Sequence, residues 1–327
     1  MKTPRNFLVP LILGVSLVLF VGGVIKKYRH SVQKGQKKVI AVIPKGTANM
    51  WWATVNQGAV KAGEEAGVTI LWTGPETETD RERQIQAVDD VLVQNVDAVV
   101  LGPNDSKALV RSAEKIVEKK IPCIIIDSPL ESECYDAFAG TDNYRGGADA
   151  AMRLGAALNG RGSVILTHFV QNSASTEERA RGFKETLAKE FPGIKIVAEQ
   201  YTLGTVEDAR QKTTDMLTKC GNVDGAYAVN HPSSVGAYKA IQSSGLGGKI
   251  HFVGFDSDPV LLDGIERKEV DALIVQNPFE IGYQGVQLAL KKLQGETLEK
   301  TYNVPSMIVD ESNLEEMKER FPSALGL

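Results

Sequence analysis

Two adjacent tryptophans stand beside an amide in the segment Asn49-Met50-Trp51-Trp52. Indole faces can stack on the apolar face of a ring, and an asparagine amide both donates and accepts hydrogen bonds. The segment follows the apolar run 39–43 and opens a helical pattern over residues 53–66, so it stands at a strand-to-helix turn. A segment at this position could form the floor of a ligand-binding site. The alternative is that at least one tryptophan is a core residue, because neighbouring helix residues point in different directions.

Polar side chains also follow other apolar runs, at the points where those runs end. They are Asn104 and Asp105 after residues 97–101, Asp127 after 122–126, Asn230 and His231 after 225–229, Asp256 after 250–254, and Gln276 after 272–275. Ligands of open α/β sheets bind outside the carboxyl ends of the strands, and carboxylates and amides can bond neighbouring hydroxyls in pairs. The set therefore predicts polyol binding. Helix N-capping is the alternative, which we favour for Asn104 and Asp105 but not for Asp127 and Asp256.

Composition limits the classes of function. The chain has 327 residues, 43% of them hydrophobic, which predicts two domains, and its net charge of -4 gives no basic surface for nucleic acid. Three cysteines without C-x-x-C spacing and four scattered histidines predict neither a metal site nor a disulfide scaffold. A Cys123–Cys134 bond and buried free thiols remain alternatives. No cofactor or catalytic motif is present, so we expect no cofactor and no enzyme activity.

The N-terminal region contains 19 consecutive uncharged residues, 7–25, with Lys and Arg on both sides. This run is long enough to span a bilayer and long for a signal peptide. We expect an uncleaved membrane anchor, with a cleaved signal as the alternative. The larger number of basic residues on the distal side argues against export. Residues 28–37 have the composition of a polar linker.

From residue 38 onward, short β-branched runs alternate with longer amphipathic segments, a pattern typical of parallel sheets covered by helices. The predicted strands are 39–43, 68–72, 97–101, 122–126, 163–167, 194–198, 225–229, 250–254 and 272–275. Predicted helices begin near Ala53, Thr79, Ser106, Arg145, Ser175, Val206, Ser234 and Pro259, and another spans 279–293. An extended segment is predicted over 302–309. The fold class is therefore α/β, with two similar halves.

Six motifs in order resemble the type 1 periplasmic sugar-binding proteins, especially the ribose-binding branch. They are Asn49-Met50-Trp51-Trp52, Ile124-Ile125-Ile126-Asp127, Thr141-Asp142-Asn143, Arg179-Ala180-Arg181-Gly182-Phe183, Val253-Gly254-Phe255-Asp256 and Ala272-Leu273-Ile274-Val275-Gln276. The resemblance implies two doubly wound parallel-sheet lobes joined by a three-stranded hinge, after an N-terminal hydrophobic helix. The implied organisation is a signal or anchor and linker over 1–37, a first lobe of 38–141 plus 277–305, and a second lobe of 142–276 plus 306–327.

The same resemblance implies a set of ligand-binding residues in the cleft between the lobes. They are Asn49, Trp51, Trp52, Asp127 and Ser128 from the first lobe, and Glu177, Asn230, Phe255, Asp256 and Gln276 from the second lobe or the hinge. Two departures are important, because Ser128 and Glu177 stand where the ribose branch has arginines. His231 stands where an aspartate is usual. With both arginines absent we expect an acidic cleft that binds a neutral or amino-substituted sugar or polyol.

The expected mechanism is closure of the two lobes around the ligand, which a membrane protein then detects. We expect a monomeric solute-binding protein that serves an ABC-type importer at the extracytoplasmic face or in the periplasm, attached or exported by its N-terminal segment. The alternative is a membrane-anchored sugar sensor linked to chemotaxis or a signalling kinase. A transcriptional regulator would need a helix-turn-helix before Lys38, where the apolar segment stands instead.

Overall fold

The computed structural model describes residues 37–325. Residues from Val39 onward form one compact unit. The apolar segment 7–25 and the membrane anchor expected from it lie outside the described residues. Between residues 37 and 325, no helix combines the length and the apolar character needed to cross a bilayer.

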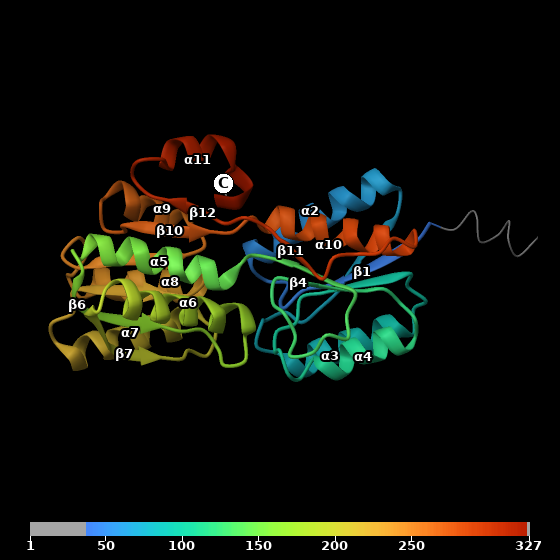
Figure 1. The fold of residues 1–327 in the computed structure, drawn as a ribbon, viewed down its shortest axis with the longest axis horizontal. Coiled ribbons are helices and arrows are strands. Elements are labelled where there is room, and N and C mark those ends of the chain that lie inside the picture. The colour runs from blue at the N-terminus through green and yellow to red at the C-terminus, as the bar shows by residue number, and fades with distance from the viewer. Residues whose placement is uncertain (1–36, 326–327) are drawn as a thin grey trace, which may run out of the picture. The chain divides into compact units, whose positions relative to one another are not determined.

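Within the described residues the strands form two sheets of six, which define a first and a second lobe (Figure 1). The first sheet has the order β11-β5-β4-β3-β1-β2, and every pair of neighbours is parallel. Its strands are β1 (Val39–Ile43), β2 (Thr69–Trp72), β3 (Ala98–Leu101), β4 (Cys123–Ile126), β5 (Ala137–Gly140) and β11 (Thr301–Asn303).

The second sheet has the order β12-β10-β9-β8-β6-β7 and is parallel except for β12, which pairs antiparallel with β10. Its strands are β6 (Arg161–Thr167), β7 (Gly193–Gln200), β8 (Gly225–Ala228), β9 (His251–Phe255), β10 (Ala272–Val275) and β12 (Met307–Val309). The predicted fold of two parallel-sheet α/β lobes is confirmed.

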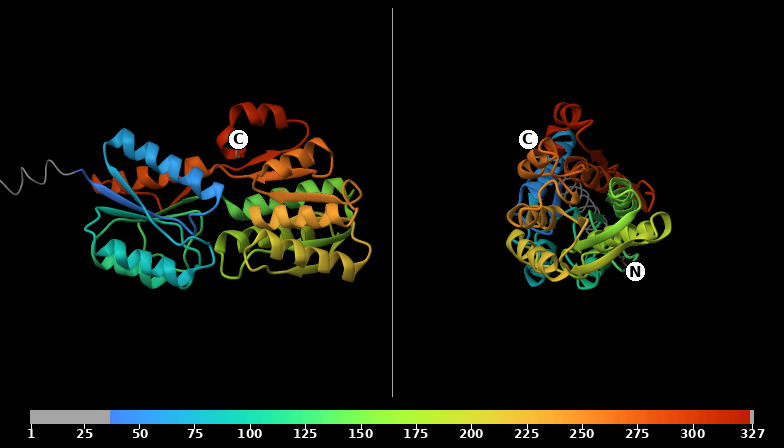
Figure 2. Two further views of the ribbon diagram at one scale, coloured as in Figure 1. Left: turned by 180° about the vertical axis from the view of Figure 1, so that it is seen from behind. Right: turned by 90° about the vertical axis from the view of Figure 1, so that its left-hand side faces the viewer.

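Helices cover both faces of each sheet, as the views from behind and from one end also show (Figure 2). The first lobe has α2 (Met50–Ala66), α3 (Arg81–Leu92), α4 (Val110–Glu118) and α10 (Pro278–Leu293). The second has α5 (Asn143–Ala157), α6 (Ala174–Glu190), α7 (Val206–Cys220), α8 (His231–Ser243), α9 (Pro259–Glu266), α11 (Leu314–Arg320) and α12 (Pro322–Leu325). Alternate residues of β1 pack on opposite faces, since Ile40 and Val42 contact the α2–α10 layer and Ala41 and Ile43 contact the α3–α4 layer.

Glycines let two helix pairs approach closely, one in each lobe. A Cβ at Gly58 of α2 would lie 1.9 Å from the Phe279 carbonyl oxygen of α10. In the second lobe, a Cβ at Gly147 of α5 would lie 1.9 Å from the Arg179 carbonyl oxygen of α6. Only glycine fits at such contacts, so these residues fix the positions of α2 and α6, which both carry residues of the site described below.

The chain crosses between the lobes three times within the described residues: between β5 and α5, between β10 and α10, and between β11 and β12. The predicted extended segment 302–309 is therefore two short strands in different sheets. Strand β5 and the C-terminal helices α11 and α12 were not predicted. Helix α2 begins three residues earlier than expected, because the Asn49 side chain accepts a hydrogen bond from the Trp52 N–H and caps the helix at Asn49.

Candidate functional site

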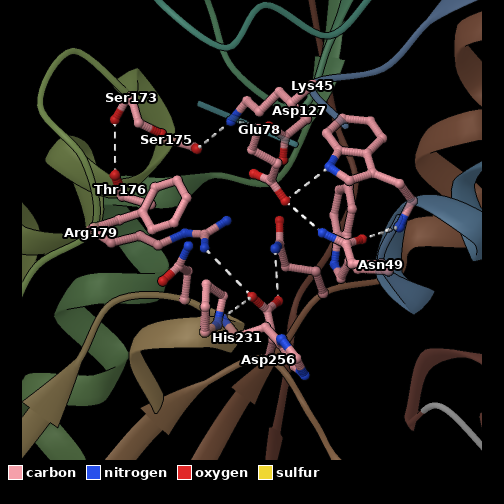
Figure 3. A pocket seen from close by; sticks show the side chains of 16 residues that line it. Lys45, Asn49, Glu78, Asp127, Ser173, Ser175, Thr176, Arg179, His231 and Asp256 are labelled. Carbon is pink, nitrogen blue, oxygen red and sulfur yellow. Dashed lines mark hydrogen bonds and ion pairs between the residues drawn. The ribbon is translucent and has the colours of Figure 1, made fainter. Parts of the chain in front are cut away.

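A cavity lies where the carboxyl ends of strands from both sheets face each other (Figure 3). Its walls come from the segments that follow β1, β2, β4, β6, β8, β9 and β10. The lining residues are Lys45, Asn49, Trp51, Trp52, Glu78, Asp127, Phe169, Ser173, Ser175, Thr176, Arg179, Asn230, His231, Pro232, Asp256 and Gln276. This is the place where open α/β sheets bind ligands, and both lobes contribute polar groups.

The N-terminus of α2 forms one wall of the cavity. Trp52 is 1% exposed and packs in the core of the first lobe, so the core interpretation holds for this residue although its ring also reaches the cavity. Its indole Nε1 donates a hydrogen bond to Glu78 Oε1 at 3.1 Å, and Asn49 Nδ2 donates to the same oxygen at 2.7 Å. Trp51 is partly exposed and crosses Trp52 edge to face, with ring centroids 4.8 Å apart.

Lys45 and Asp127 form a buried ion pair in the first lobe, with the ammonium nitrogen 2.5 Å from Asp127 Oδ2. The ammonium group also donates to Ser128 Oγ at 2.6 Å and to Ser175 Oγ at 3.2 Å. Ser175 lies on α6 of the second lobe, so Lys45 joins the two lobes directly. Such a short, buried, hydrogen-bonded pair fixes both side chains.

A buried glutamine holds the end of β1 in place and thereby positions Lys45. Gln84 of α3 donates through Nε2 to the carbonyl oxygens of Pro44 and Gly102, at 2.8 and 2.7 Å. Its Oε1 accepts from the Asn104 N–H at 2.9 Å. Because all three bonds are buried, the segments after β1 and β3 keep a fixed separation.

Arg179 is the buried cation of the second-lobe half of the site, as Lys45 is of the first-lobe half. It is 2% exposed, and its guanidinium lies 3.8 Å above the Phe255 ring and 3.8 Å from Asp256 Oδ2. Its Nε donates to Asn143 Oδ1 at 2.8 Å, and Nη1 donates to the Val229 carbonyl oxygen at 3.1 Å. All these partners belong to the second lobe, which assembles this half of the site without help from the first.

Asp127 and Asp256 occupy equivalent places, each directly after a strand of its own lobe. Both have left-handed backbones, with φ of 63° and 65°. Asp256 Oδ1 accepts from Gln276 Nε2 at 2.8 Å, and its Oδ2 accepts from the His231 N–H at 3.0 Å. A positive φ is uncommon outside glycine and is concentrated at functional sites, which supports a ligand-facing role for both carboxylates.

Two titratable side chains of the cavity have shifted pKa values. Burial raises the pKa of Glu78, and the nearby charge of Lys45 opposes this shift only in part. Burial lowers the pKa of His231, but the hydrogen bond with Asp258 and the charges of Asp256 and Asp258 outweigh it, so the net shift is upward. His231 Nε2 lies 3.0 Å from Asp258 Oδ2.

Hydrogen bonds cross between the lobes at the edge of the cavity. Ser128 Oγ donates to Ser175 Oγ at 2.8 Å, and the Ser175 N–H donates to Ser128 Oγ at 3.3 Å. The Ser106 N–H of the first lobe donates to the Asn172 carbonyl oxygen of the second at 3.0 Å. The structure therefore represents a closed arrangement of the two lobes.

The structure brings seven of the ten sequence-predicted site residues to the cavity wall: Asn49, Trp51, Trp52, Asp127, Asn230, Asp256 and Gln276. Ser128 lies buried behind the wall, where it bonds Lys45 and Ser175, and Phe255 lies beneath Arg179. Glu177 is not at the cavity, because its place in the first turn of α6 directs its carboxylate to Tyr201, whose hydroxyl donates to it at 2.9 Å.

Sequence patterns did not predict Lys45 or Glu78 as residues of the cavity wall. The acidic cleft was predicted from two absent arginines and from carboxylates at Asp127, Asp256 and Glu177. The wall contains two cations, Lys45 and Arg179, and three carboxylates, Glu78, Asp127 and Asp256, so carboxylates still outnumber cations by one. Glu78 follows β2, the edge strand of the first sheet, and the segment after this strand was not searched for polar residues. Lys45 stands only two residues after β1, beside the segment that begins at Asn49. Between residues 37 and 325, no cluster of three or more potential metal ligands occurs.

Comparison with known proteins identifies the family. Residues 40–297 match the periplasmic binding protein domain, so the chain belongs to the periplasmic binding protein family. The D-ribose/D-allose-binding protein of Pseudomonas aeruginosa is 29% identical over 276 residues, which cover 81% of this chain and 85% of that protein. The predicted resemblance is confirmed, and so is the prediction that the chain is a binding protein and not an enzyme.

Solved structures agree with this assignment. The carbohydrate-transporter solute-binding protein of Agrobacterium radiobacter, in complex with D-arabinose, has a TM-score of 0.83 and 31% sequence identity, and the match covers 87% of this chain and 98% of that one. The periplasmic solute-binding protein of an ABC transporter from Actinobacillus succinogenes, with bound D-allose, has a TM-score of 0.80 and 27% identity over 86% of this chain and 100% of that one. The protein is thus a solute-binding protein of the kind that serves ABC-type sugar transport.

Proposed function

We propose that the protein encloses one neutral or amino-substituted monosaccharide in the cavity between its lobes and delivers it to an ABC-type importer at the extracytoplasmic face. The observation that carries the proposal is the pairing of charges in the cavity wall. Each lobe supplies one cation that already has a carboxylate partner, Lys45 with Asp127 and Arg179 with Asp256. The carboxylate of a sugar acid, or a sugar phosphate, would find no unpaired cation and would be buried at high cost.

The chemistry of the cavity wall supports the binding of a single sugar ring. Amides from both lobes, Asn49 and Asn230 among them, line the cavity together with the Trp51 ring. The relatives bind D-ribose, D-allose or D-arabinose, all of which are uncharged single sugars.

Closure of the lobes couples binding to transport. Lys45, Ser128 and Ser175 make their cross-lobe bonds only when the lobes are together. A sugar that contacts both walls adds to these bonds and shifts the population toward the closed form by its differential affinity. A misplaced hydroxyl would leave a buried polar group without a partner, which is the physical basis for discrimination among stereoisomers.

Thermal unfolding of the full-length protein against sugars tests the proposal. The panel contains D-ribose, D-allose, D-arabinose, D-glucose, D-glucosamine, myo-inositol and D-galacturonate. A ligand at about a hundred times its dissociation constant adds roughly 2.7 kcal/mol to the free energy of unfolding. We expect a raised midpoint with a neutral or amino sugar and none with D-galacturonate. A shift with the sugar acid alone would contradict the proposed ligand class.

A further inference from the structure

Glu78 presents an oxygen to the cavity that the protein leaves free. Asn49 Nδ2 and Trp52 Nε1 both donate to Oε1, so Oε2 receives no hydrogen bond from the residues between 37 and 325. Figure 3 shows the carboxylate extending from the first-lobe side toward the middle of the cavity. The two donors fix the orientation of the carboxylate, so Oε2 is available to accept a hydrogen bond from a ligand.

The charges around the cavity leave Glu78 without a cation of its own. Among the described side chains of the wall, the carboxylates are Glu78, Asp127 and Asp256, and the cations are Lys45 and Arg179. Lys45 lies 2.5 Å from Asp127, and Arg179 lies 3.8 Å from Asp256. One negative charge therefore remains, and it belongs to Glu78.

The neighbouring titratable groups do not remove this imbalance. His231 faces the cavity, but its ring lies 3.0 Å from Asp258, so a protonated His231 neutralises that carboxylate. Arg81 lies 3.2 Å from Asp105 and 3.6 Å from Glu82. Burial raises the pKa of Glu78, and the charge of Lys45, which is paired with Asp127, opposes this shift only in part.

Two further polar atoms of the wall have no partner among the described residues. Ser173 Oγ is buried, in a residue that is 1% exposed, and Trp51 Nε1 is buried as well. Buried polar atoms are normally hydrogen-bonded, so both require an acceptor or donor that the protein does not provide. Sugar hydroxyls can serve as that partner, whereas Glu78 Oε2 accepts only and favours a charged donor.

We propose that Glu78 Oε2 receives the ammonium group of an amino sugar, so that the protein binds an amino sugar more tightly than the neutral sugar of the same configuration. The proposal rests on the proposed function and narrows its ligand class. The ammonium group supplies the missing positive charge and donates a charge-assisted hydrogen bond, which is roughly twice as strong as a neutral one. The Ser173 hydroxyl and the Trp51 indole are left for the ring hydroxyls.

The test measures dissociation constants by calorimetry with full-length protein at pH 7.5. The probes are D-glucosamine, D-galactosamine and D-mannosamine, each compared with its parent hexose and with its N-acetyl derivative, which keeps the nitrogen but removes the charge. We expect at least one amine to bind about tenfold more tightly than its parent and than its N-acetyl form. This comparison needs no variant and so does not depend on how a variant folds.

Two variants test whether Glu78 causes the preference for the amino sugar. E78Q should abolish the preference for the amine while neutral sugars still bind, and E177Q, which changes a carboxylate outside the cavity, should behave as wild type. If the parent hexoses bind as tightly as the amines and E78Q affects both equally, the inference is wrong and the proposed function stands. If neither these probes nor the neutral pentoses bind, the proposed function fails and the inference with it.

Discussion

The two halves of the cavity hold their buried cations in different ways. Arg179 takes every partner from the second lobe: Asn143, Val229, Phe255 and Asp256. Lys45 pairs with Asp127 in its own lobe but also donates to Ser175 of the other. The second half-site is therefore complete within one lobe, whereas the first is completed only by closure. We therefore expect the second lobe to keep its half-site without closure and the half-site of the first lobe to change on closure.

The largest expected effect on stability comes from a substitution in the second-lobe half of the cavity, whose contacts all lie within one lobe. R179M removes the only cation within 4.0 Å of the buried Asp256 among the described residues. Loss of one partner of a buried pair costs about 3–5 kcal/mol, so we expect a fall of that size in the free energy of unfolding, measured with urea. R181M is the matched control, since Arg181 is half exposed on the same helix and should lose less than about 1 kcal/mol. Equal losses in the two variants would show that Arg179 does not support the second half-site.

A substitution in the first-lobe half of the cavity, which closure completes, should change sugar affinity instead of stability. S128A deletes the hydroxyl that joins Lys45 to Ser175, behind the cavity wall. A hydrogen bond contributes about 0.5–1.5 kcal/mol, so we expect sugar affinity to fall between about twofold and tenfold by calorimetry. S243A, an exposed serine on α8, should bind as wild type. Unchanged affinity in S128A would mean that these bonds do not contribute to closure.

A smaller effect should appear in the pH dependence of stability. The pKa of His231 is raised in the folded protein, so the folded state binds its proton more tightly than the unfolded chain does. The resulting stability is present below about pH 6.5 and is lost as pH rises through the folded pKa. We expect wild type to exceed H231Q by more at pH 6 than at pH 8.5 in urea unfolding. A difference that does not change with pH would show that Asp258 does not stabilise the protonated ring.

The smallest effect is predicted for the residue that the structure places outside the cavity. E177A should change sugar affinity by less than about twofold, since its carboxylate bonds the Tyr201 hydroxyl on the surface. The measurement is the same calorimetric titration. A large loss would place Glu177 in the site after all and would remove the contrast with Glu78.

Sequence patterns predicted most strands and the seven cavity residues because these features are local. Asp127 and Asp256 each end an apolar run, and strand ends of parallel sheets meet at one edge. The charge of the cavity is not local. Lys45 and Glu78 stand 33 positions apart in loops after different strands, and the tertiary fold alone brings Lys45 to Asp127 and Glu78 to Trp52.

Short elements were missed for a similar reason. Strand β5 has only four residues, Ala137–Gly140, two of them alanine and one glycine, and it becomes a strand because β4 and β11 flank it in the sheet. Helix α11 lies after the last motif of the resemblance and is held by Leu314, which packs into the second-lobe core. Tertiary packing decides the structure of both segments.

The most direct test of the account is a tryptophan fluorescence titration of the full-length protein with the sugar that raises its unfolding midpoint. Trp51 and Trp52 both line the cavity on the first lobe, the half that closure completes. We predict a saturable change at one sugar per chain, strongly reduced in W51F. Stabilisation by the sugar without any fluorescence change would place binding elsewhere and would contradict a ligand enclosed between the two lobes.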